Sequence, residues 1–379
     1  MKLNTTKIDT IDEIRLIRDE WNELHSRCSY SSIYNSHDYL FSACNSFHLE
    51  PDSLYFLIVR KSENNKLVAI FPFILTDYNW HRVKFHIIIY AGLNEADKPY
   101  PIIDSRLEKE AWQATIDHIK MDKHRWQFLE LVEISEGLSA PTIIADQFSS
   151  FPFYQKLEKD VDSPIFDLNI NWLEFWGMHK KMRKKVRKMQ SDFGESMQFK
   201  ILNDADGMKN YLNAYMELES KSWKFERKIG ISRSDSYINF YTQFFQKLAS
   251  KNNLFFGFLY IDDQLVSAEI AYTCGEIVYF SHGSFDKSFN RYSPGMVSTC
   301  LFLKYFHESR YSKGDFLAGF SHYVNPWASS IQRSFNQTIY RITPKLITAY
   351  LFGIAAKLIF TPFKLIKKKF IGQKIKLEK

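Results

Sequence analysis

The stretch from residue 276 to residue 295 reads EIVYFSHGSFDKSFNRYSPG, and it decides the fold that the sequence predicts. Apolar residues dominate its first ten positions, which is typical of a buried strand over 276–285. A polar loop follows, and Ser-Pro-Gly at 293–295 marks the start of a helix over 296–310. A short strand at 315–318 completes a strand, helix, strand order, which indicates an α/β unit.

The predicted helix start carries a further expectation. Free amide groups and the helix dipole at such a start attract anions, so the pyrophosphate of coenzyme A suits this position. A Ser-Pro pair is also an ordinary helix-start signal, and spacing alone leaves both interpretations open.

A hairpin pattern occurs twice in the chain. Residues 254–273 read as two strands around the turn IDDQ, and residues 54–75 read as two strands around the turn SENN. Leu67-Val68-Ala69 aligns with Leu265-Val266-Ser267, and the two hairpins start 200 residues apart. We therefore expect two copies of one mixed α/β unit.

Composition limits the class of protein and the expected location. The four cysteines form no CxxC pair and have no histidines at zinc-like spacing, so we expect neither a metal site nor a disulfide framework. The N-terminus carries acidic residues early and reads as no signal peptide, which predicts a cytoplasmic protein.

The net charge of +7 is confined to the tail. Residues 357–379 hold eight lysines and one glutamate, 8 − 1 = +7, so the preceding 356 residues sum to zero. The apolar run 346–356 precedes these lysines and is too short to span a membrane. Two interpretations stay open: an amphipathic tail on an anionic membrane surface, peripheral at the inner face, or a terminal helix packed on the body.

A second basic stretch, the predicted helix 179–190, carries seven Lys and Arg residues between positions 180 and 188. Met182, Val186 and Met189 form its thin apolar seam. The helix is either a solvated face or a site for phosphates of a carrier, a nucleotide-linked sugar, a tRNA or an anionic lipid.

Three segments together resemble the GNAT superfamily of acetyltransferases, in the branch similar to CelD-like (BioF2-like) proteins of polysaccharide biosynthesis. They are residues 172–195 (WLEFWGMHKKMRKKVRKMQSDFGE), 283–296 (GSFDKSFNRYSPGM) and 314–327 (GDFLAGFSHYVNPW). The resemblance covers roughly residues 20–342 and implies two tandem GNAT-like domains, with distant similarity to Fem-type aminoacyltransferases.

The resemblance also implies a donor site. In the place of the usual pyrophosphate loop the sequence has RYSPGM, so Arg291, Ser293, Gly295 and Met296 are the expected contacts of acyl-CoA, with acetyl-CoA as the main candidate. The loop departs from the superfamily pattern. An acyl carrier protein or an aminoacyl-tRNA therefore stays open as the donor.

The resemblance implies the mechanism of GNAT enzymes. Two neighbouring strands separate to admit the thioester, and a backbone amide near a bulge polarises its carbonyl. A general base then removes the proton of the acceptor. The candidate bases are Glu269, His282 and Asp286; each is also readable as a structural residue, Asp286 as a pin for the loop after the strand. Tyr323 stands where the superfamily often places the tyrosine that protonates the leaving thiolate. The family usually has a Lys after this tyrosine, whereas Val324 follows here.

We therefore expect a mixed α/β protein with an N-terminal GNAT-like domain at 1–165, a C-terminal acyltransferase domain at 166–345 and a basic tail at 346–379. The expected function is N- or O-acyl transfer to a sugar or other precursor of an envelope polysaccharide or glycoconjugate. One rival is a Fem-type transferase that uses aminoacyl-tRNA on a peptidoglycan precursor, the one case in which we expect nucleic acid. The other is a catalytically degenerate GNAT-fold scaffold of a membrane biosynthetic complex.

Overall fold

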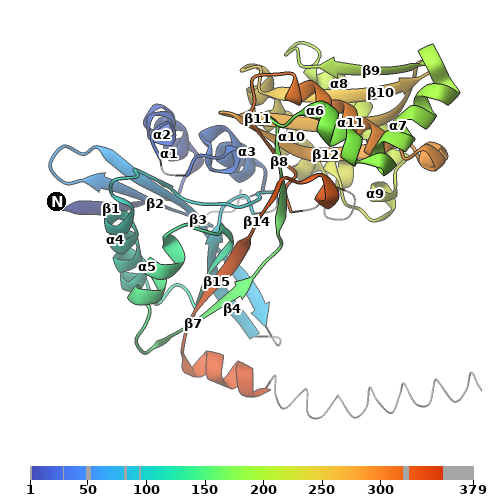
Figure 1. Ribbon diagram of the computed structural model, residues 1–379. Helices are drawn as coiled ribbons and strands as arrows, with labels where there is room; N and C mark the ends of the chain where they lie inside the picture. Colours follow the sequence, from blue (N-terminus) through green and yellow to red (C-terminus); the bar gives the residue numbers. More distant parts are fainter. Residues whose placement is uncertain are drawn as a thin grey trace, which may run out of the picture.

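The computed structural model describes residues 2–28, 30–47, 53–80, 83–93, 95–318 and 324–352. Within these residues the chain folds into two mixed sheets with helices packed against them (Figure 1). The helices are α1 (Ile11–Leu16), α2 (Arg18–His25), α3 (His37–Phe47), α4 (Glu108–Met121), α5 (Ala140–Gln147), α6 (Trp172–Met178), α7 (Lys180–Phe193), α8 (Met208–Ser220), α9 (Trp223–Glu226), α10 (Asp235–Ala249) and α11 (Pro294–His307).

The first sheet has the strand order β1-β2-β3-β4-β6-β15-β7, with β5 paired to β3. Its first four strands run antiparallel, and β4 then pairs in parallel with β6. Its strands are β1 (Leu3–Ile8), β2 (Leu54–Lys61), β3 (Leu67–Trp80), β4 (Val83–Tyr90), β5 (Ile102–Ile103), β6 (Phe128–Ser135), β7 (Phe153–Lys159) and β15 (Ser334–Arg341).

The second sheet, in the order β9-β10-β11-β12-β13-β8-β14, repeats this plan. Four antiparallel strands lead to a parallel pair, β12 and β13. Its strands are β8 (Ser163–Asp167), β9 (Met197–Leu202), β10 (Leu254–Ile261), β11 (Gln264–Cys274), β12 (Ile277–Phe285), β13 (Lys313–Asp315) and β14 (Ser330–Gln332). The shared order confirms the expected repeat of one mixed α/β unit.

The expected domain boundaries do not follow the sheets. The strand near residues 336–342 was expected to end the second unit, but β15 pairs with β6 and β7 of the first sheet. Conversely, β8 follows β7 in the chain but pairs with β13 and β14 of the second sheet. The chain thus crosses between sheets near residue 160 and again near residue 333. A boundary at 165 falls inside β8 and separates β15 from its partners β6 and β7, because hydrogen-bonded partners and not sequence order define a sheet.

The second hairpin shows why its sequence predicts a turn. Ile261 pairs with Gln264, so the loop between β10 and β11 has two residues, Asp262 and Asp263. Both have positive φ, 48° and 63°. A two-residue turn with two left-handed residues matches the twist of the flanking strands, and aspartate tolerates this conformation better than most residues.

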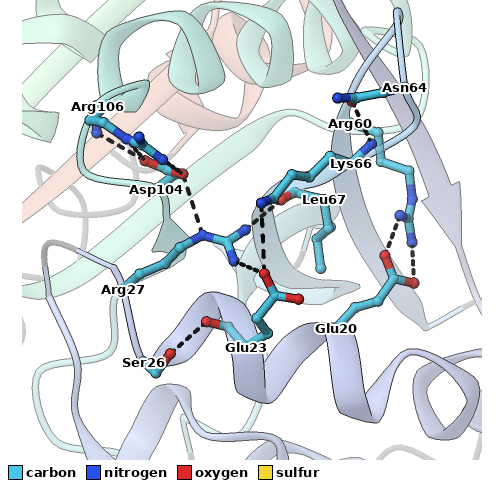
Figure 2. A network of polar contacts seen from close by, with 10 residues as sticks. All are labelled: Glu20, Glu23, Ser26, Arg27, Arg60, Asn64, Lys66, Leu67, Asp104 and Arg106. Atoms are coloured by element: carbon cyan, nitrogen blue, oxygen red, sulfur yellow. Dashed lines mark hydrogen bonds and ion pairs between the residues drawn. The ribbon is translucent and has the colours of Figure 1, made fainter.

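A polar network joins α2 to the first hairpin and to β5 (Figure 2). Arg60 of β2 forms a two-pronged ion pair with Glu20, at 2.5 and 3.0 Å. Arg27 pairs with Glu23, donates to the carbonyl of Leu67 at 3.0 Å and reaches Asp104. These contacts fix α2 against the outer strands of the first sheet.

One hydrophobic core runs through both sheets. Helix α3 of the first unit packs against α10 of the second, and the Tyr39 ring lies 5.3 Å from the Phe244 ring. The hydroxyl groups of Tyr34 and Tyr272 are 2.9 Å apart at the same junction. A separate core fills the other face of the second sheet, between its strands and α7 and α11. The second sheet therefore has one face toward α8, α10 and the first unit, and one face toward α7 and α11.

Among the helices that the structure describes, none combines the length and the apolar character that a membrane span requires. The expected tail falls mostly outside the described residues, which end at residue 352 in a helix that begins at residue 344.

Candidate functional site

The second sheet opens where β12 and β13 separate. The two strands pair in parallel over only three residues, of which Tyr279 and Asp315 are the last. Beyond this point β12 continues to Phe285, whereas β13 ends. The expected neighbouring strands are present, and within the part of the chain that the structure describes no strand pairs with β12 past Tyr279 on the β13 side.

A β-bulge interrupts β12 just past the fork. His282 pairs with Ile270 and Phe280 pairs with Ala271, so Ser281 is the extra residue. Strict alternation places Phe280, His282 and Ser284 on one face, as the sequence predicts. The bulge corrects this: Phe280 packs in the core beneath α11, whereas His282 contacts Tyr241 of α10 on the opposite face. A bulge leaves one residue unpaired and re-aims the side chains that follow it.

His282 lies in a polar network that both units build. Its Nε2 is 3.0 Å from the hydroxyl of Tyr241 and 3.9 Å from a carboxylate oxygen of Glu95, a residue of the loop after β4. Tyr241 also donates to Glu95, and Arg233 forms an ion pair with the same carboxylate. Burial, together with the cations Lys224 and Arg233, holds the pKa of His282 well below its usual range. The imidazole is therefore neutral at pH 7, with Nε2 next to the Tyr241 hydroxyl and Nδ1 next to the Ser281 hydroxyl.

Glu269 lies on the other face of the sheet. Its carboxylate accepts from the hydroxyl of Thr299 of α11 at 2.8 Å, and burial raises the pKa of Glu269 to about 8. Gly283 faces it across the strands, and a Cβ there would stand 2.7 Å from a Glu269 oxygen. The two candidate bases Glu269 and His282 are thus separated by the sheet.

Asp286 caps the turn that follows β12. Its carboxylate accepts from the backbone amide of Ser288 at 2.9 Å and from the Ser288 hydroxyl at 2.7 Å. This is the loop-pinning geometry that was the alternative interpretation of Asp286. Tyr323, the fourth candidate, lies outside the described residues.

Helix α11 begins beside the fork, and its first turn is open. Ser293 precedes it in the left-handed conformation, with φ of 57°, and no side chain caps the helix. Pro294 has no amide hydrogen, so the first available donors are the amides of Gly295 and Met296. Met296 is itself half-buried against the core.

Two cations flank this helix start. The guanidinium of Arg291 lies 4.7 Å from the centre of the Tyr292 ring, and the ammonium of Lys188 lies 5.5 Å from it. Lys188 belongs to α7, whose Met182, Val186 and Met189 are buried as the predicted seam requires. Arg291, Ser293, Gly295 and Met296 therefore come together at one helix start, with a basic helix beside them.

Residues of the first unit brace the fork. Lys98, 3% exposed, forms an ion pair with Asp315 at 2.6 Å, at the last paired position of β13. Asp97 accepts from the amide of Ala318 at 2.6 Å. The backbone amide of Lys98 donates to Glu133 at 2.7 Å, and burial raises the pKa of Glu133 to about 7.

The backbone of this brace is strained. Lys98, Glu133 and Leu317 all have positive φ, between 50° and 58°, although none is glycine. Such residues cost on the order of 1–3 kcal/mol each and persist where the surrounding contacts hold them, often at functional sites. The sequence did not predict the roles of Glu95, Lys98, Arg233 and Tyr241, because their partners are distant in the sequence.

Metal chemistry finds no support in this part of the chain. Within the described ranges, no group of His, Cys, Asp and Glu side chains is arranged to hold a metal ion.

Comparison with known proteins finds a family that is similar to part of this chain. Residues 178–324 match the family model described as an acetyltransferase (GNAT) domain. This part of the chain, less than half of its length, is therefore similar to a GNAT-type acetyltransferase domain; the similarity agrees with the superfamily expected for the second unit and supports an acyltransferase. No curated protein matches the sequence.

Solved structures extend the likeness to nearly the whole chain. The crystal structure of FemX superposes on 92% of this chain and 99% of its own, at 11% identity and a TM-score of 0.59. The C-terminal domain (DUF2156) of a putative lysylphosphatidylglycerol synthetase from Agrobacterium fabrum covers 92% of this chain and 97% of its own, at 10% identity and a TM-score of 0.55. At these identities the likeness shows the fold, and the tandem α/β architecture is the common feature.

Proposed function

We propose that the protein transfers an acyl group from a carrier thioester to an amine or hydroxyl group. One observation carries the proposal: β12 and β13 separate at the bulge, with an open helix start on one face and a neutral, networked histidine on the other. A thioester held in the fork has its carrier on the α11 face and its carbonyl within reach of an acceptor on the His282 face. The similarity of residues 178–324 to an acetyltransferase (GNAT) domain supports acyl transfer as the reaction class.

The donor side fits a phosphorylated carrier such as acyl-CoA, with acetyl-CoA as the first candidate. The amides of Gly295 and Met296 and the helix dipole favour an anion at the start of α11. Arg291 and Lys188 add positive charge on both sides of Tyr292. When bound, coenzyme A supplies the activated thioester, and these residues orient it.

The acceptor side provides the base. In this proposal His282 takes the proton of the attacking amine or hydroxyl: its imidazole is neutral in the resting protein, and the nearby Glu95 carboxylate offers a counter-charge to the imidazolium that forms. Tyr241 and Glu95 then stabilise the proton on that side, since Glu95 lies 3.9 Å from the imidazole nitrogen. The backbone around Ser281 leaves the ladder at the bulge, and an amide there donates to the developing oxyanion.

The remaining candidates take supporting roles in this proposal. Glu269 and Asp286 order the sheet and the turn that position the fork. Tyr323 stays the candidate for protonating the leaving thiolate.

The acceptor is proposed from the CelD-like resemblance of the three sequence segments: a sugar or other precursor of an envelope polysaccharide or glycoconjugate. The early acidic residues of the N-terminus and the lysine-rich tail after residue 356 support a proposed location in the cytoplasm, peripheral at the inner face of the membrane.

Aminoacyl transfer from a tRNA to a peptidoglycan precursor is the second candidate. It is supported by the basic face of α7, whose cations form no ion pair with another described residue, and by the fold shared with FemX. Such binding weakens steeply with salt, because phosphate contacts release counterions.

A thermal-shift panel of coenzyme A, acetyl-CoA and tRNA separates these candidates. We expect saturable stabilisation by coenzyme A that Arg291→Gln weakens about ten-fold, as loss of one charge-assisted contact does. Arg310→Gln is the matched control, because Arg310 lies 5.4 Å from the Tyr311 ring at the other end of α11. Stabilisation by tRNA but not by coenzyme A supports the second candidate. Stabilisation by none of them, with no thioester turnover, rejects both candidates in favour of a scaffold.

A further inference from the structure

Helix α6 and the outer side of α7 present a surface that does not include Lys188, the α7 residue on the proposed coenzyme A side. Residues 171–191 contain seven basic residues, all between positions 180 and 188, and one acidic residue, Glu174. The net charge of this stretch is therefore 7 − 1 = +6. Lys180, Lys184 and Arg187 are exposed on the side of α7 that points away from its buried seam. Within the described part of the chain these three side chains have no acidic partner.

Apolar side chains stand beside these cations. Leu173 of α6 is 80% exposed and Met178 is 66% exposed. Trp172 and Trp176 are half-buried and stack on one another, with ring centres 6.5 Å apart. Exposed aliphatic side chains cost free energy in water, and a group of them usually marks an interaction surface.

A cavity opens between the same helices and α11. It has a volume of about 280 Å³ and is lined by Trp172, Leu173, Trp176, Val186, Cys300 and Lys304, among others. An apolar hollow with a lysine at its edge suits a hydrocarbon chain that carries an anionic head.

We infer that the surface formed by α6 and the outer side of α7 docks the protein on an anionic phospholipid bilayer. The cations match negatively charged head groups, tryptophan prefers the boundary between water and hydrocarbon, and Leu173 and Met178 insert below it. RNA also carries negatively charged phosphates, but it has no hydrocarbon region in which exposed aliphatic side chains are buried. The combination of cations and aliphatic side chains on this surface therefore favours a membrane.

This surface is separate from the lysine-rich tail. Figure 1 shows α6 and α7 near one end of the molecule, and the helix that leads to the tail near the other end. The inference therefore does not depend on the tail, nor on which acyl group the fork transfers. It adds a second membrane contact that holds the GNAT-type unit at a surface where lipid-linked molecules are found.

Vesicle co-sedimentation of the full chain tests this docking. Vesicles of phosphatidylcholine alone are compared with vesicles that contain about one third phosphatidylglycerol. We expect the variant Lys180→Gln/Lys184→Gln/Arg187→Gln to lose on the order of 100-fold in partition coefficient on anionic vesicles, since each cation contributes about a factor of five. We expect Leu173→Ser/Met178→Ser to lose about ten-fold.

Matched controls change the same side-chain types elsewhere. Lys109→Gln/Lys123→Gln/Lys209→Gln removes three exposed lysines, and Leu16→Ser/Met121→Ser removes two apolar side chains that are 83% and 72% exposed. Neither control is expected to change binding more than about two-fold.

A fifth variant, with Lys364, Lys367, Lys368 and Lys369 changed to Gln, isolates the tail. If it abolishes vesicle binding while the α7 variant binds as the parent does, the inference is wrong. The inference is equally wrong if the α7 variant loses affinity for bulk tRNA but keeps vesicle binding. Coenzyme A stabilisation is measured in parallel, so a failure here is distinguishable from a failure of the proposed acyl transfer.

Discussion

The buried ion pair at the fork allows a quantitative prediction. Lys98 and Asp315 have side chains that are 3% and 5% exposed, and their charged atoms are 2.6 Å apart. Replacing Lys98 by Met leaves Asp315 and Asp97 buried without their ion-pair partner. Each keeps one backbone donor, from Leu317 at 2.9 Å and from Ala318 at 2.6 Å. Removal of one partner of a buried pair costs about 3–5 kcal/mol, and we expect Lys98→Met to fall in that range at pH 8.

The pH dependence of this loss has a definite sign. Burial raises the pKa of Asp97 above its usual value already in the parent protein. Without Lys98 the pKa of Asp97 rises further, and a carboxyl whose folded pKa exceeds its unfolded pKa contributes less stability as pH rises through the folded value. The loss is therefore smaller at pH 5 than at pH 8, by about 1.4 kcal/mol for each pKa unit.

Urea unfolding at pH 5 and pH 8 measures the free energy of unfolding of parent and variant. We expect one cooperative transition, because both units share a hydrophobic core. Lys84→Met is the matched control. Lys84 and Asp77 are also 2.6 Å apart, but their side chains are 61% and 48% exposed. An exposed pair contributes about 0–1 kcal/mol. If Lys98→Met costs no more than Lys84→Met at pH 8, the brace does not stabilise the fork as argued.

Three further predictions concern the same region. Burial raises the pKa of Glu133 to about 7, so the stability of the parent falls relative to Glu133→Gln as pH rises from 6 to 8; urea unfolding that shows the opposite trend contradicts this. Tyr241→Phe removes the hydroxyl that links His282 to Glu95, so we expect kcat of acyl transfer to fall at least ten-fold and its pH profile to change. Tyr34→Phe, in the shared core, is the control and leaves the pH profile of kcat unchanged. Gly283→Ala places a Cβ 2.7 Å from a Glu269 oxygen and should lower the free energy of unfolding by about 1–3 kcal/mol; equal stability would show that the carboxyl moves freely.

Much of the fold follows from local sequence patterns. Alternation and turn residues placed both hairpins, and the three- and four-residue spacing of Met182, Val186 and Met189 placed the buried seam of α7. These patterns are readable because neighbouring side chains on one face of a strand or helix recur at fixed spacing. The prediction of a tandem mixed α/β chain rests on this periodicity and is confirmed.

The candidate site was predictable only in part. Arg291, Ser293 and Gly295 lie together at the start of α11 because they are close in the sequence. The role of His282 depended on one extra residue in β12, and no periodicity predicts where a bulge interrupts a strand. Glu95 reaches His282 from the first unit, across 187 positions, and such contacts leave no local pattern.

Residue order along this chain dictated which segments became strands and helices, since those preferences arise between near neighbours. Three-dimensional packing dictated the rest: β15 joined the first sheet, β8 joined the second, and the loop after β4 supplied Glu95, Asp97 and Lys98 to the fork. The physical reason is that strand edges and buried charges are satisfied by whichever partner the folded backbone brings within hydrogen-bond distance, irrespective of its place in the sequence.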